Sequence, residues 1–95
     1  MTNTLFTNFN ILISDELSEY LIRYTKQNDL LEVAKKTGVS FSTIDNVRRQ
    51  RAVLKPSNAE AMTELTRLAI RNYTHRNAID SRLTKEYEQG INVSG

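Results

Sequence analysis

The sequence has 95 residues, no cysteine and a formal net charge of only +2. A chain of this length forms one small domain with a modest core, and the lack of cysteine excludes a disulfide framework and thiolate chemistry. The longest purely apolar run, Ile11-Leu12-Ile13, is far too short for a membrane span or the core of a signal peptide, so we expect a cytoplasmic protein with no membrane partner.

Residues 1–13 are rich in Thr and Asn, carry no charge and fit two structures. The alternation of Phe9, Ile11 and Ile13 fits a short edge strand, paired with a second copy or with the segment 91–93 near the other end. We favour the other structure, a loose tail whose last apolar residues pack onto the first helix. Because the segment has no Lys or Arg, we do not expect it to enter the minor groove of DNA.

The first helix should begin after Ser14, whose hydroxyl can cap it, with Asp15-Glu16 at the positive end of the helix dipole. Apolar and aromatic residues then recur at spacings of three and four, which predicts one buried face made of Leu17, Tyr20, Leu21 and Tyr24. We expect this helix to end at Asn28-Asp29. Asp29 should then cap the next helix, with Glu32 completing a capping box.

Residues 30–49 predict two short helices joined at a glycine. The buried side of the first should comprise Leu31, Ala34 and the edge of Val33. This helix should end at Thr37-Gly38, because only glycine takes a left-handed conformation at little cost. Ser40 can cap a second helix that begins at Phe41, and its inner face should consist of two apolar residues three apart, Ile44 and Val47.

This stretch resembles the helix-turn-helix of the phage repressor and Cro-like, or lambda repressor-like, family. In that family an alanine, a glycine four residues later, a Val-Ser pair and two apolar residues three apart recur, here as Ala34, Gly38, Val39-Ser40, Ile44 and Val47. The similarity covers residues 17–72. It implies an all-α, compact four- or five-helix domain that places its second motif helix in the major groove of double-stranded DNA. The glycine that usually follows this helix is absent, so the turn at 50–53 should have another geometry.

A further helix is predicted after Pro56, with Ser57 as its cap and Glu60 bonded back to the Ser57 amide. Its buried stripe should consist of Met62, Leu65, Leu68 and Ala69. Beyond residue 72 the pattern weakens but continues until Gly90, so either one helix spans 57–88 or the helix breaks near 72–77. We favour the break, because Asn, Thr, His and Asn are poor helix formers.

The domain organisation that follows is an N-terminal segment at 1–13, a DNA-binding domain at 14–72 and a helical extension at 73–95. The extension carries apolar residues outside the family core, namely Tyr73, Ile79, Leu83 and Tyr87. These side chains would be exposed in a monomer, so we expect a homodimer through residues 73–95, assisted by residues 5–13.

Positive charge is concentrated in the middle of the chain. Residues 41–76 hold seven basic and three acidic side chains, whereas each flanking segment has a net charge of −1. If the second motif helix reads DNA, base edges should meet Ser42, Asp45, Asn46 and Arg49, and phosphates should meet Ser40, Thr43, Arg48, Arg51 and Lys55. Phe41 should either stack on a thymine methyl or deoxyribose, or be buried against the first motif helix.

Catalysis has little support in this sequence. There is one histidine, His75, which is expected on a helix surface, and the carboxylates show neither a paired-acid nor a metal-ligand spacing. We therefore expect no enzyme, metal or cofactor, and favour a sequence-specific transcriptional regulator. The alternative is a protein-interaction module, such as a phage-encoded inhibitor whose helix-turn-helix face binds a host protein.

Overall fold

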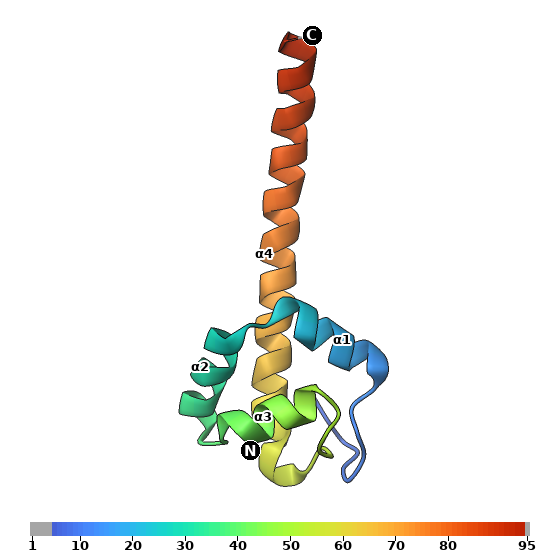
Figure 1. Cartoon of the computed structure of the whole chain (residues 1–95), viewed down its shortest axis with the longest axis vertical. Coiled ribbons are helices and arrows are strands. Elements are labelled where there is room, and N and C mark those ends of the chain that lie inside the picture. Colours follow the sequence, from blue (N-terminus) through green and yellow to red (C-terminus); the bar gives the residue numbers. More distant parts are fainter. Residues whose placement is uncertain (1–4, 95) are drawn as a thin grey trace.

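The computed structural model describes the backbone of residues 5–94 and the side chains of residues 5–76. Its described part contains four helices, α1 (Asp15–Tyr24), α2 (Gln27–Thr37), α3 (Phe41–Arg48) and α4 (Pro56–Ser94). Helices α1 to α3 surround the first half of α4, and the rest of α4 projects from them as a single rod (Figure 1). We call residues 5–76 the head and residues 77–94 the stem. The predicted all-α class is confirmed.

The core lies between the four helices of the head. Leu21 of α1 and Leu30 of α2 are fully buried, and both meet the predicted α4 stripe, in which Met62, Leu65 and Ala69 have no exposed surface. Full burial of one such aliphatic side chain is worth about 1.5–3 kcal/mol, so these contacts dominate the stability of the head. The remaining stripe residue, Leu68, packs against the core while partly buried.

Helix α2 begins three residues earlier than expected. Asp29 does not precede this helix but lies within its first turn, where its Oδ2 accepts a hydrogen bond of 2.8 Å from the Lys26 amide. This earlier start also changes the inner face, because Leu30 is fully buried and Leu31 is 44% exposed. The sequence pattern assigned Leu31 to the core wrongly, since either leucine fits a three- to four-residue spacing.

Helix α4 begins at Pro56, and the side chain that bonds back to its start is that of Asn58, in the first turn, and not that of Ser57. The Asn58 Oδ1 accepts a 2.9 Å hydrogen bond from the Lys55 amide, while Ser57 is exposed. The predicted break near 72–77 is wrong, and so is the predicted end at Gly90, because α4 continues to Ser94. Each weak helix former costs at most about 0.7–1 kcal/mol, and extension of a helix already nucleated by burial avoids the nucleation cost.

The N-terminal segment packs onto its own chain. The Asn10 amide donates to the Leu54 carbonyl and the Leu54 amide donates to the Ile11 carbonyl, both at 2.7 Å, which makes one antiparallel bridge. Ile13 is 5% exposed and belongs to the core. Pairing with 91–93 is ruled out because those residues lie in α4. The first four residues of the predicted segment lie outside the described part of the chain.

Candidate nucleic-acid interface

The turn between α2 and α3 has the geometry that its residues predict. Gly38 adopts a left-handed conformation with φ 76°, and its amide donates a 2.9 Å hydrogen bond to the Ala34 carbonyl. Ser40 Oγ then accepts a 3.2 Å hydrogen bond from the Thr43 amide, which caps α3. These contacts end one helix and begin the next within three residues, and so set the angle between α2 and α3.

The inner side of α3 is formed by Ile44 and Val47, which are both fully buried. Their burial leaves Ser42 exposed and Asn46 half-buried on the remaining surface. The Asn46 side-chain amide makes no hydrogen bond within the described residues, so both its donor and its acceptor are available to a partner. Phe41 and Thr43 are half-buried, and the Phe41 ring packs against the core. Ser40 is exposed at the start of the helix.

Arg48 does not lie on the surface where its expected phosphate contact requires it. The residue is 7% exposed, and its Nε and Nη2 donate hydrogen bonds of 3.2 and 2.6 Å to Asp45 Oδ1. Its Nη1 lies 3.4 Å from Thr25 Oγ1, and its carbonyl accepts a 2.6 Å hydrogen bond from Ser18 Oγ. We call Ser18, Thr25, Asp45 and Arg48 the α1–α3 seam. Arg48 holds α3 against α1 and has no free donor face for DNA.

Asp45 is neutralised by its own helix. Arg49 Nε lies 3.1 Å from Asp45 Oδ1 and 3.3 Å from Oδ2, so the carboxylate is shared between two arginines. Burial raises the pKa of Asp45, but hydrogen bonds from Arg48 and Arg49 outweigh this effect and hold the pKa below its ordinary value. The carboxylate that was expected to meet a base edge is therefore compensated within the protein.

The turn after α3 has a glutamine at the position where the family that the sequence resembles usually has glycine. Gln50 has φ 61°, a left-handed conformation that costs a non-glycine residue roughly 1–2 kcal/mol. Its side-chain Nε2 donates to the Ile13 carbonyl and to Asp15 Oδ1, both at 2.8 Å. These two hydrogen bonds offset the strain and anchor the turn to the start of α1. Sequence reasoning missed this role, because the partners of Gln50 are distant in the chain.

Arg51 and Lys55 are exposed, and neither has an ion-pair partner among the side chains of residues 5–76. Together with the partly exposed Arg49 they form what we call the basic rim. Of the four cations between residues 48 and 55, Arg49, Arg51 and Lys55 are thus exposed and Arg48 is buried. The rim supplies positive charge at the end of α3, where a phosphate backbone could contact it.

Within residues 5–76, no three His, Cys, Asp or Glu side chains are grouped to hold a metal ion. No helix in the described part is both long and apolar enough to cross a membrane. His75 is exposed on α4.

The chain was compared with protein-family models, with curated proteins and with solved structures, and it matches none of them.

Proposed function

We propose that this chain is a sequence-specific DNA-binding transcriptional regulator with a lambda repressor-like helix-turn-helix, in which α3 lies in the major groove. One observation carries the proposal. Gly38 and Ser40 join two short helices around the buried pair Ile44 and Val47, and this leaves a polar outer surface on α3 next to the basic rim. A short capped helix of this kind, held at a fixed angle and bordered by cations, suits entry into a groove lined by phosphates.

The side chains of this surface divide into two groups by what they can donate. Base edges would be read by Asn46, whose amide suits adenine, and by Ser42 and Arg49. Phosphates would be held by the Ser40 and Thr43 hydroxyls, which are 2.8 Å apart, and by Arg51 and Lys55. We no longer include Asp45 among the base contacts, because its carboxylate is already bonded to Arg48 and Arg49.

The test is selection of bound duplexes from a random DNA library, followed by titration of the selected and an unselected duplex. Asn46→Ala should weaken binding to the selected duplex by about 1–3 kcal/mol and leave the unselected duplex unchanged. Asn8→Ala removes an exposed amide from the N-terminal segment and serves as the matched control, with no effect on either duplex. Absence of binding to any duplex at about 50 mM salt would refute the proposal.

A second copy would supply the second recognition helix, since one such helix covers only about half of a repressor site. We therefore propose a homodimer within residues 73–95, through the part of this segment that forms the stem. Support comes from the stem, which continues beyond the head, and from a sequence that places Ile79, Leu83 and Tyr87 four residues apart along it. Light scattering should give a dimer for the wild type and a monomer for Leu83→Lys, whereas Ser81→Lys, a lysine at a polar position, should remain dimeric. A monomeric wild type at high concentration would contradict this assembly.

The alternative function, a protein-interaction module built on the same surface, is favoured by one observation. Arg48 and part of the Arg49 charge are consumed by Asp45, so α3 itself offers little unpaired positive charge to a phosphate backbone. Under this alternative Arg51→Ala changes no DNA titration. A salt-dependent loss of duplex binding in that variant would exclude it.

A further inference from the structure

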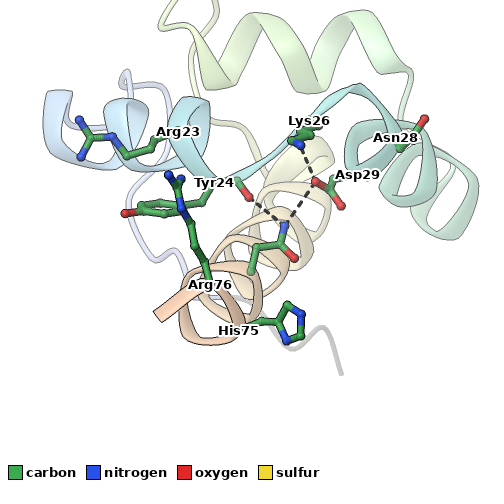
Figure 2. Close-up of a pocket in the computed structure, with 8 residues that line it drawn as sticks. Arg23, Tyr24, Lys26, Asn28, Asp29, His75 and Arg76 are labelled. Atoms are coloured by element: carbon green, nitrogen blue, oxygen red, sulfur yellow. Dashed lines mark hydrogen bonds between the residues drawn. The ribbon is translucent and has the colours of Figure 1, made fainter. Parts of the chain in front are cut away.

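A second candidate site lies where the connection between α1 and α2 crosses α4. A concavity of about 600 Å³ opens there, lined mainly by cationic and amide side chains together with one aromatic ring, Arg23, Tyr24, Lys26, Asn72, His75 and Arg76. Figure 2 shows Arg76 extending from α4 toward Tyr24 of α1, so that both helices contribute to the lining. The volume falls within the range of about 300–1,000 Å³ typical of small-molecule sites.

The base of this concavity is held by a short hydrogen-bond network. Asn72 Nδ2 donates to the Tyr24 carbonyl at 2.8 Å and to Asp29 Oδ2 at 3.3 Å, and the Lys26 amide donates to the same carboxylate oxygen at 2.8 Å (Figure 2). The carboxylate of Asp29 is thus engaged by neutral donors. The network joins α1, α2 and α4, so the surrounding side chains project from a fixed backbone.

The cations around this network lack internal partners. Arg23, Lys26 and Arg76 are all exposed, and none forms an ion pair with a described side chain. The contrast with the cleft between α2 and α4 is clear, because there Glu64 pairs with Lys36 at 2.9 Å and with Arg67 at 3.3 Å. Three cationic side chains thus line a concavity that contains one carboxylate, and Arg23 extends away from the Asp29 network (Figure 2). Such a site attracts an anion of more than one charge.

We propose that this concavity binds the phosphate or diphosphate group of a small molecule. A guanidinium can hold two phosphate oxygens at once, and a lysine ammonium contributes a compact charge beside it. The adjoining aromatic surface suits the organic part of the ligand. Tyr24 packs against Tyr20 and Tyr73 with ring centroids 5.0 and 5.1 Å away, and Tyr73 remains 39% exposed. Burial and the neighbouring Tyr24 and Tyr73 raise the pKa of Tyr20 above its ordinary value.

This site is separate from the proposed DNA surface. Figure 1 places the α1–α2 connection at the end of the head from which the stem leaves, and α3 farther from the stem. None of the residues that line the concavity belongs to α3 or to the basic rim. A duplex on α3 would leave the concavity open, and the inference stands whether or not the chain binds DNA.

The experiment is a titration of the full chain with inorganic pyrophosphate at near-physiological salt. Calorimetry measures the affinity, and amide chemical shifts locate the bound ligand. We expect saturable binding, with shifts concentrated at residues 23–29 and 72–76. Arg76→Gln should weaken binding about tenfold, as expected for loss of one charge-assisted contact. Arg51→Gln is the matched control, because it removes the same charge from the basic rim and should change the affinity less than about twofold.

Three results would overturn the proposal as stated. The first is the absence of saturable pyrophosphate binding up to about 10 mM. The second is an equal weakening of binding by Arg51→Gln, which would indicate general attraction to a basic protein. The third concerns the source of the phosphate. If Arg76→Gln weakens duplex binding and a duplex displaces pyrophosphate, the site holds the DNA backbone and not a small molecule. Unchanged duplex titrations in Arg76→Gln together with tenfold weaker pyrophosphate binding would support the small-molecule site.

Discussion

The α1–α3 seam and the basic rim contain arginines that are neighbours in the sequence but lie in opposite environments. Arg48 is 7% exposed and bonds to Asp45 and Thr25, whereas Arg51 is exposed without an ion-pair partner among the described side chains. Between them, Arg49 is shared, because its side chain is 42% exposed and still contacts Asp45. A cluster of like charges in a sequence thus does not define one surface.

The reason for this difference is helical geometry. Successive residues on a helix point about 100° apart, so Arg48 follows Val47 toward α1 while Arg49 turns to the outside. The buried arginine is tolerated because its charge is paired and the hydroxyl groups of Ser18 and Thr25 surround its end of α3. Seam residues should therefore govern stability and rim residues should govern binding.

The sharpest test of this division is Arg48→Ala. Removing it leaves Asp45 half-buried with only the exposed Arg49 as its partner, so the free energy of unfolding should fall by about 2–3 kcal/mol. Urea denaturation followed by circular dichroism measures this loss. Arg51→Ala is the control and should change stability by less than about 0.5 kcal/mol. Equal losses in the two variants would remove the distinction between seam and rim.

The angle between α2 and α3 should depend on the turn at Gly38. A Cβ added there would meet no atom within 4 Å, so any cost of substitution arises from the left-handed backbone alone. Gly38→Val should lower the free energy of unfolding by about 1–3 kcal/mol. Gly38→Asn should cost clearly less, because asparagine tolerates this conformation. Identical melting temperatures for the two variants would show that the turn is unstrained.

The Asp45 carboxylate links the seam to acid stability. Its pKa is lowered in the folded protein, so its contribution is complete above the ordinary value of 3.8 and is lost as the pH falls through the lower folded value. Glu64 acts in the same direction, because the hydrogen bond from Lys36 lowers its pKa. Asp45→Asn should lower the free energy of unfolding by about 1 kcal/mol at pH 7, because the hydrogen bonds to the arginines become weaker. The variant should also lose less stability than the wild type as the pH falls. Chemical denaturation at a series of pH values from neutral to acid checks both effects. A stability difference that does not narrow in acid would contradict this account.

The smallest effects on stability are expected at the basic rim. Arg51→Ala and Lys55→Ala should each weaken binding to all duplexes alike and reduce the magnitude of the salt slope by about one, while leaving unfolding almost unchanged. Fluorescence anisotropy at several salt concentrations gives the slope. A variant that loses affinity for only the selected duplex would place its residue among the base contacts.

Much of the geometry of α2, α3 and the turn between them was determined by the sequence itself. Three features were predicted correctly: the conformation of Gly38, the cap at Ser40 and the burial of Ile44 and Val47. Each of them depends on residues no more than four positions apart. Such features depend on backbone sterics, capping and helical period, which act locally and can be read without knowledge of distant partners.

Tertiary structure decided the features that depend on distant partners. Arg48 lies against Ser18, 30 positions away in the chain, whose Oγ donates to its carbonyl, and Gln50 holds a strained turn through Ile13, 37 positions away. The choice of Leu30 over Leu31, and the continuity of α4 past residue 72, likewise followed from packing in the head. Local preferences at these positions differ by about 1 kcal/mol or less, so burial and long-range hydrogen bonds determine the outcome.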